Sequence, residues 1–388
     1  MLGLLAAAEV LGMACWFSAS AVSEPLATRW SLSIAEVGWL IGAVQLGFVA
    51  GTAVAALLNL ADTLPAKAYF SLSAVFTALA NGALLLAPGY GTALFLRFLT
   101  GFFLAGVYPP AMKMVATWFR RGRGLAIGTV VGALTLGKAS PYLLKVLALT
   151  SFRAVILATS LGCLGAAALV AAGYREGPHS FARRPFSWSL AGTVLRHRPT
   201  RLAVFGYLGH MWELYAMWTW IPAFLAASLL ARGPAAGEPA FLTSEVLAFG
   251  AIGAGALGCV WGGWQADRMG RERLVNLAML ASGACCLAVG AFFGADPLWL
   301  ALVTWAWGFF VVADSAQFST LVTEVAPEHA VGTALTLQTS LGFLLTLVTI
   351  QWVPRLADLW GWAWAFPLLA LGPAFGISAI QRLAAVRR

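Results

Sequence analysis

The chain has 388 residues, of which 61% are hydrophobic and only 10% are charged, and its formal net charge is +9. Soluble domains carry about 25% charged residues, so this composition excludes a soluble globular protein, a disordered chain and a secreted disulfide scaffold. The remaining class is an all-α, polytopic protein that crosses a lipid bilayer several times.

Twelve runs of the sequence are apolar enough to cross a bilayer, because a spanning helix needs about 20 mostly apolar residues. Proline, glycine and charged residues separate these runs. The spans are predicted, in chain order, at residues 2–22, 37–60, 68–87, 92–119, 125–146, 154–173, 202–229, 246–265, 274–293, 298–325, 331–353 and 362–381.

The basic residues indicate which way the chain crosses the membrane. With a cytoplasmic N-terminus, sixteen of the 24 Lys and Arg residues fall in cytoplasmic loops or the C-terminal tail, five fall in outer loops, and three fall within spans. An excess of Lys and Arg on the cytoplasmic side is typical of membrane proteins. We therefore expect a multi-pass protein of the cytoplasmic membrane with both termini cytoplasmic, and no nucleic-acid partner is needed to explain the charge.

The sequence repeats itself at an offset of about 205 residues, which indicates a duplicated six-helix unit. The matching segments, first half then second half, are Gly101-Phe102-Phe103 with Gly308-Phe309-Phe310, Gly128-Thr129 with Gly332-Thr333, Glu36-Val37 with Glu245-Val246, and Ala61-Asp62 with Ala266-Asp267. We expect an N-terminal six-helix bundle at 1–174, a cytoplasmic linker at 175–200 and a C-terminal six-helix bundle at 201–388. Transporters built from such repeats bind their substrate between the halves.

The run GWQADRMGRER, from Gly263 to Arg273, resembles the G-x-x-x-D-R-x-G-R-x-R loop of the major facilitator superfamily. Arg97 and Gly101 fit that family's R-x-x-x-G element in the fourth span, and the continuation to Pro109 is similar to the organic-anion branches. The resemblance covers essentially the whole chain. It implies the family fold of twelve helices and transport by alternating access.

Two departures from the family pattern limit what the resemblance implies. The first-half copy of the loop keeps Asp62 but lacks the Gly, Arg and Gly positions, so a gating role for Asp62 is in doubt. The Gly-Pro pair expected in the fifth span of proton-driven multidrug exporters is not matched, which counts against that activity.

Residues 263–273, here called the gating loop, carry charge at two helix ends. An acid near the end of one helix and arginines at the start of the next can hold the cytoplasmic ends together. The expected gating residues are Asp62, Gly263, Asp267, Arg268, Gly270, Arg271 and Arg273.

Two glycine-rich segments resemble nucleotide-binding motifs without meeting their requirements. Gly132–Ala139 lacks the Ser or Thr of a P-loop, and Gly253–Gly258 lies inside a predicted span rather than between a strand and a helix. Both suit close helix packing in lipid. The five cysteines lie in apolar runs without metal-ligand spacing, so we expect no metal, no cofactor and no enzymatic activity.

Charged residues within the spans point to function, because each costs at least about 2.5–3.5 kcal/mol in a bilayer. They are Glu9, Arg97, Lys113, Lys138, His210, Glu213 and Asp314. We expect the proton carrier among Glu9, Glu213 and Asp314, because intramembrane acids commonly carry protons. Arg97 and Lys138 suit a functional or a structural role equally, and His210 could simply pair with Glu213.

Each of the three acids has a tryptophan seven residues away, which places both side chains on one helix face. The pairs are Glu9 with Trp16, Glu213 with Trp220, and Asp314 with Trp307; coincidence is the alternative, since the chain has 17 tryptophans. Tyr108 shares a face with Arg97, and Gln317 could add a hydrogen bond. Basic and aromatic walls suit a small organic anion.

The sequence therefore predicts a monomeric secondary transporter whose partners are a small organic anion, protons and membrane lipid. One alternative is an exporter of hydrophobic or cationic compounds that uses the three acids, and another is a non-transporting sensor with the same fold. Uptake that rises with an inward proton gradient and with negative substrate charge would favour the transporter of organic anions over both alternatives.

Overall fold

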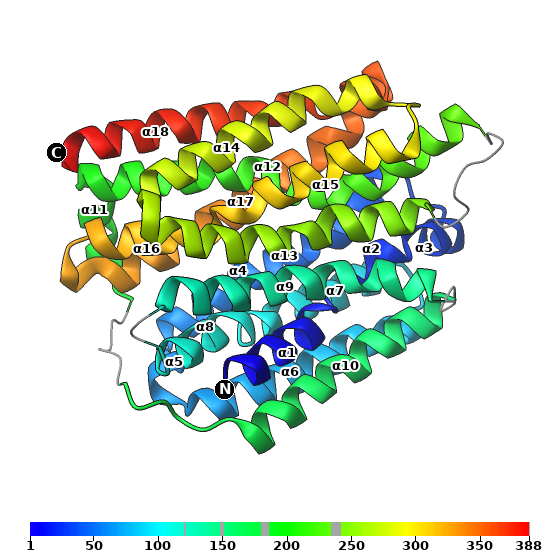
Figure 1. Ribbon diagram of the computed structural model, residues 1–388. Coiled ribbons are helices and arrows are strands. Elements are labelled where there is room, and N and C mark those ends of the chain that lie inside the picture. Colours follow the sequence, from blue (N-terminus) through cyan, green and yellow to red (C-terminus); the bar gives the residue numbers. More distant parts are fainter. Residues whose placement is uncertain (120–121, 148–150, 180–185, 234–241, 388) are drawn as a thin grey trace.

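The computed structural model is a bundle of helices that lie nearly along one axis (Figure 1). It describes residues 1–119, 122–147, 151–179, 186–233 and 242–387, apart from the side chains of Ala61, Asp62 and Arg123. The α-helices are α1 (Leu2–Met13), α2 (Ser18–Ala21), α3 (Ser23–Trp30), α4 (Ile34–Leu57), α5 (Leu60–Thr63), α6 (Ala66–Ala83), α7 (Tyr90–Leu104), α8 (Tyr108–Ala116), α9 (Arg123–Val146), α10 (Phe152–Gly173), α11 (Trp188–Arg196), α12 (Arg198–Arg232), α13 (Ser244–Met269), α14 (Arg271–Ala288), α15 (Pro297–Ala313), α16 (Ser315–Val325), α17 (Val331–Trp360) and α18 (Leu371–Arg387). Short 3-10 segments are η1 (Leu84–Leu86), η2 (Val289–Phe292), η3 (Glu328–Ala330), η4 (Trp362–Trp364) and η5 (Pro367–Ala370).

Ten helical segments of the described chain are long and apolar enough to span a membrane, and they correspond to ten of the twelve predicted spans. The predicted spans 2–22 and 125–146 are not among them. The first is wrong as one helix, because α1 ends at Met13 and the chain turns before α2 and α3. The second is the continuous helix α9, whose apolar character is reduced by Lys138, Ser140 and Pro141. The all-α, multi-pass class is confirmed, and the count of twelve stays a prediction.

Two spans are interrupted at equivalent points of the sequence repeat. α8 follows α7 after a break at residues 105–107, and α16 follows α15 after a break at Asp314. The second break lies about 207 residues after the first. The same offset relates two close helix contacts, in which Gly101 packs on the Val44 carbonyl and Gly308 packs on the Ala251 carbonyl. Neither position has room for a side chain.

Helix neighbours recur in the same way. α4 packs on α7 as α13 packs on α15, and α6 packs on α10 as α14 packs on α18. α1 contacts α9 and α10, and α12 contacts α17 and α18. This pattern supports the internal repeat, whereas the boundaries of the two bundles stay a prediction.

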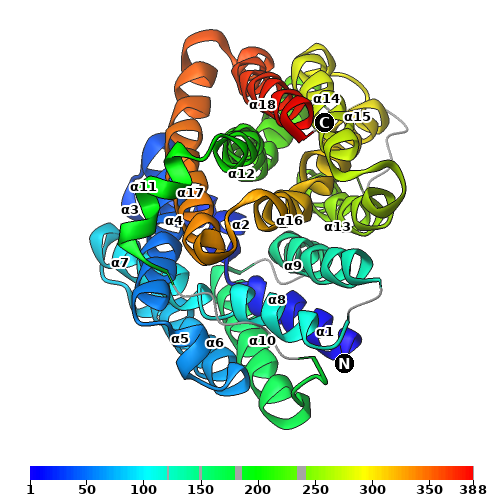
Figure 2. The same ribbon diagram turned by 90° about the vertical axis from the view of Figure 1, so that its left-hand side faces the viewer.

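Two helix pairs make the most extensive contacts between the first part of the chain and the second, namely α4 with α17 and α9 with α13 (Figure 2). Glycines allow α9 and α13 to approach closely. A Cβ on Gly128 would lie 2.6 Å from the Cys259 carbonyl oxygen, and one on Gly132 would lie 2.7 Å from that of Ala256. Small residues at helix interfaces permit such contact in membranes.

The two chain ends differ in position along the bundle. The C-terminal end lies at the same end of the bundle as α11, and the N-terminus lies partway along the bundle (Figure 1). The expected cytoplasmic position of both termini stays a prediction.

Candidate functional site

Lys138 lies near the middle of the bundle with only 1% of its surface exposed. Its Nζ donates a hydrogen bond to the Tyr215 hydroxyl at 2.5 Å. It also lies 4.0 Å from the ring centroid of Trp16, 4.6 Å from that of Tyr215 and 5.1 Å from that of Trp218. Ring faces attract cations. Lys138, Trp16, Tyr215 and Trp218 are here called the central cage. They join α9, α12 and the turn after α1.

Glu9 on α1 is fully buried, and neither carboxylate oxygen has a hydrogen-bond partner in the described part of the chain. It lies within electrostatic reach of Lys138, although no described carboxylate forms an ion pair with that ammonium group. A buried carboxylate without partners is costly as an anion. Glu9 is therefore a candidate for proton binding.

Glu213 has partners for both of its oxygens. Oε1 accepts a hydrogen bond from the Trp307 indole at 2.6 Å, and Oε2 accepts one from the Ser282 hydroxyl at 2.9 Å. The spacing in the sequence had placed Glu213 with Trp220, but the Trp220 indole instead donates to the Ile350 carbonyl at 2.7 Å. Glu213 therefore helps to join α12, α14 and α15.

His210 does not pair with Glu213. Its Nδ1 lies 3.0 Å from Asp314 Oδ1, and both side chains are buried. Asp314 occupies the break between α15 and α16, so this pair ties the break to α12.

Arg97 is buried, and no described carboxylate forms an ion pair with it. Its guanidinium donates to the carbonyl oxygens of Cys15 at 3.1 Å and of Trp16. It also donates to Asn81 Oδ1 at 3.0 Å. These acceptors lie at the turn between α1 and α2 or on α6, so Arg97 braces the interruption in the first predicted span. These contacts are those of a structural brace, and the role of Arg97 in transport stays a prediction.

The central cage encloses only a small cavity of about 40 Å³, which Tyr108, Tyr207 and Phe343 also line. A larger hollow of about 500 Å³ lies toward the end of the bundle that carries the gating loop, and Tyr108, Gln317 and Arg271 line it. Tyr108 therefore faces both spaces.

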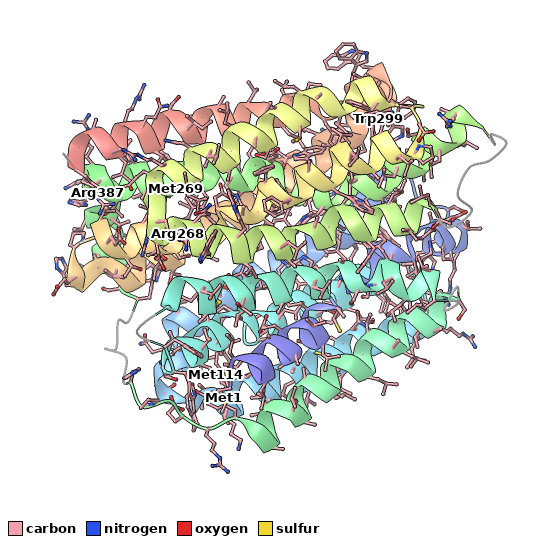
Figure 3. All side chains as sticks on the ribbon, in the orientation of Figure 1. Met1, Met114, Arg268, Met269, Trp299 and Arg387 are labelled. Atoms are coloured by element: carbon pink, nitrogen blue, oxygen red, sulfur yellow. The ribbon has the colours of Figure 1, made fainter. Side chains whose placement is uncertain are left out.

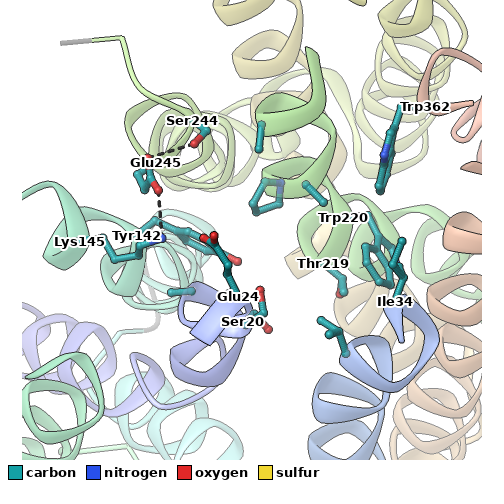
Figure 4. Close-up of a pocket in the computed structure, with 16 residues that line it drawn as sticks. Ser20, Glu24, Ile34, Tyr142, Lys145, Thr219, Trp220, Ser244, Glu245 and Trp362 are labelled. Atoms are coloured by element: carbon teal, nitrogen blue, oxygen red, sulfur yellow. Dashed lines mark hydrogen bonds and ion pairs between the residues drawn. The ribbon is translucent and has the colours of Figure 1, made fainter. Parts of the chain in front are cut away.

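Another hollow, of about 400 Å³, opens at the opposite end of the bundle (Figure 4). Trp220 and Tyr142 line it, and Lys145 on α9 forms an ion pair with Glu245 on α13 at its edge, with a distance of 3.0 Å between Nζ and Oε1. The closed centre thus lies between two open hollows.

The gating loop contacts helices of both halves. Arg271 lies 3.0 Å from Glu324 on α16 and 3.9 Å from Asp267, measured between nitrogen and oxygen. The Asp267 carboxylate lies 3.2 Å from where a Cβ on Gly124 would be, in the first turn of α9. A negative charge there is stabilised by the helix dipole.

The other expected gating residues have varied positions. Gly270 adopts φ +87° between α13 and α14, a conformation that favours glycine. Arg268 stacks on Trp264 with 3.6 Å between the guanidinium carbon and the ring centroid, Gly263 packs on the Gly124 carbonyl, and Arg273 is exposed. The Asp62 side chain lies outside the described residues.

Sequence reasoning missed residues that contact the buried charged side chains, namely Tyr215 and Trp218 around Lys138, Asn81 beside Arg97, and Ser282 beside Glu213. Asn81 and Ser282 were detectable as polar residues within apolar runs. Tyr215 and Trp218 carry no such signal, because aromatic residues are common in spans.

One comparison with known proteins gave a match. A family model described as Major Facilitator Superfamily matches residues 4–350. No curated protein matches the sequence.

Proposed function

The chain belongs to the Major Facilitator Superfamily, and from that premise we propose that this secondary transporter moves a small organic anion together with protons by alternating access. The family supplies the general activity, a multi-pass membrane location and a small-molecule substrate. The anionic substrate, the proton coupling, the monomeric state and the cytoplasmic membrane are our proposals.

The observation that carries the substrate class is the central cage. Lys138 offers a cation that forms no ion pair with a described carboxylate, and aromatic rings surround it. A carboxylate or similar anion could accept a charge-assisted hydrogen bond from its Nζ while an apolar portion contacts the rings. The cavity of about 40 Å³ is too small for a substrate as it stands, so binding requires the cage to open.

The neighbouring acid supports the coupling. Glu9 is close enough to Lys138 to be influenced by its charge. When a substrate anion binds beside Lys138, it adds negative charge near Glu9 and favours uptake of a proton there. Anion and proton would then travel together.

The test begins with thermal unfolding of the purified protein against small carboxylates and, separately, quaternary amines, since a ligand of the folded state stabilises it. Binding of the most stabilising carboxylate is then measured at one pH and one salt concentration. Replacing Lys138 with Gln should weaken binding about ten- to hundred-fold, because a hydrogen bond to a charged group is lost. Lys138→Arg should retain part of the affinity with altered selectivity.

Arg153→Gln provides the matched control, because it removes one positive charge from an exposed position at the start of α10. Its binding should equal that of the parent. Equal affinities for Lys138→Gln and the parent would refute the anion site.

An exporter of cationic or hydrophobic compounds is the second candidate, and the aromatic walls with the unpartnered Glu9 favour it. It predicts stabilisation by quaternary amines and a loss of binding in Glu9→Gln but not in Lys138→Gln. A sensor that kept the fold predicts ligand binding without transport into proteoliposomes.

A further inference from the structure

Two adjacent hollows lie on the outside of the bundle, along α12 and α18. One, of about 370 Å³, is lined by Arg198, Arg201 and Arg382 together with Phe205 and Phe375. The other, of about 290 Å³, has a wholly apolar lining that includes Leu208, Trp212, Leu345, Leu371 and Phe375. Phe375 borders both, so the two hollows are continuous at its ring.

The three arginines are available to an external anion. Arg198, Arg201 and Arg382 are exposed, and none forms an ion pair with a described carboxylate. α18 contains no acidic residue, and α12 contains none before Glu213. Arg387, at the same end of the bundle, differs because Glu272 and Glu324 pair with it (Figure 3).

The order of the two hollows along the bundle follows from helix geometry. Leu208 lies seven residues after Arg201 on α12, and Phe375 lies seven residues before Arg382 on α18. Seven residues of helix span about 10 Å. The apolar hollow therefore lies about 10 Å deeper in the bundle than the arginines. The arginines at the helix ends and the apolar groove next to them are complementary to the headgroup and the acyl chain of a lipid.

We propose that α12 and α18 form a binding site for an anionic phospholipid. The arginines hold the phosphate, since guanidinium groups bind phosphate through paired hydrogen bonds. One acyl chain lies against Phe375 and Trp212. Basic pockets between transmembrane helices are known to bind anionic headgroups. A soluble anion would use the arginines but would leave the apolar hollow empty, so the pair of hollows favours a lipid.

The test is binding of dioleoyl phosphatidylglycerol to the detergent-purified protein, measured by native mass spectrometry, with dioleoyl phosphatidylcholine for comparison. We expect phosphatidylglycerol to bind more tightly. Each arginine should contribute about five-fold in affinity, so Arg201→Gln should weaken binding about five-fold and the triple Gln variant about hundred-fold. The arginines are exposed, so these variants should fold like the parent.

Three comparisons make the proposal falsifiable. Arg175→Gln removes an exposed arginine away from both hollows and should bind phosphatidylglycerol like the parent. An equal loss in that control would indicate attraction by overall charge and would overturn the site. Equal binding of phosphatidylcholine, or unchanged binding in the triple variant, would also overturn it. Glycerol phosphate, which has no acyl chain, should not compete; competition at similar affinity would replace the lipid by a soluble phosphate.

Discussion

The three buried carboxyl groups differ in what surrounds their oxygens. Glu213 accepts hydrogen bonds from Trp307 and Ser282, and Asp314 faces His210. Neither oxygen of Glu9 has a partner in the described structure. In water-poor surroundings, a proton on Glu9 removes a charge that no hydrogen bond stabilises. Of the three, Glu9 is therefore the best candidate for the proton carrier.

Glu9→Gln should keep counterflow exchange of substrate but lose accumulation driven by a proton gradient, because an amide cannot take up and release the proton. Glu213→Gln and Asp314→Asn should still accumulate substrate at a reduced rate, since each amide keeps a carbonyl acceptor for Trp307 or His210. Exchange and accumulation are measured in proteoliposomes. Accumulation by Glu9→Gln against a gradient would show that the proton moves elsewhere.

At this scale, the sequence predicted which residues are buried but not what they contact. Helical spacing alone places the Thr135 and Tyr142 hydroxyls on the same face of α9 as Lys138, yet the Thr135 hydroxyl donates to the Val131 carbonyl and the Tyr142 hydroxyl has no described partner. The cation instead meets Tyr215 on α12. Helical periodicity relates residues of one helix, and contacts between helices depend on packing that a single helix does not encode.

Among the helices, the close contacts set by glycine define how the elements pack. Gly101→Ala should reduce stability by at least about 1–3 kcal/mol, because its Cβ would overlap the Val44 carbonyl of α4 and force α7 outward. Gly91→Ala on the same helix is the control, since nothing lies within 4 Å of its added Cβ. Thermal unfolding in one detergent compares the variants. Equal midpoints would mean that α4 and α7 can separate without loss.

The sequence repeat predicted that Gly101 and Gly308 are equivalent positions, but nothing in the sequence predicted the interruption after α1. Residues 14–17 are Ala, Cys, Trp and Phe, so hydropathy gives no sign of a helix end there. The free carbonyls of Cys15 and Trp16 bind Arg97, which α7 supplies. A helix break held by another helix is a tertiary feature, which explains why one long span was predicted.

For the whole molecule, the gating loop should control the rate of conformational exchange rather than substrate affinity. Asp267 and Arg271 contact α9 and α16, away from the central cage. Asp267→Ala or Arg271→Ala should slow uptake several-fold, because Asp267 contacts the first half at Gly124 and Arg271 pairs with Asp267, so both stabilise one arrangement of the two halves, whereas binding constants should change little.

Paired measurements of binding and uptake check this expectation. Arg153→Gln again provides the charge control, since Arg153 is exposed on α10 and belongs to neither the loop nor the hollows. Unchanged uptake in both loop variants would remove the gating role. A parallel loss of affinity would mean that the loop acts on the substrate site itself.

The architecture of the whole molecule was easier to predict from the sequence than the helix packing or the side-chain contacts. Composition predicted a multi-pass helical protein, and the motif from Gly263 to Arg273 led to the family that the match over residues 4–350 establishes. The closed centre between two hollows was not predictable, because it depends on how side chains from several helices fill one space.

The proximity of Glu9 and Lys138 has an electrical consequence. A single proton shared by this pair, whether it resides on the carboxylate or on the amine, leaves a net charge of zero. A monovalent anion that binds together with one further proton keeps that sum at zero. Moving one elementary charge across the membrane potential is worth about 2.3 kcal/mol per 100 mV. A centre that is neutral both empty and loaded avoids this work, so voltage would neither drive nor oppose its reorientation.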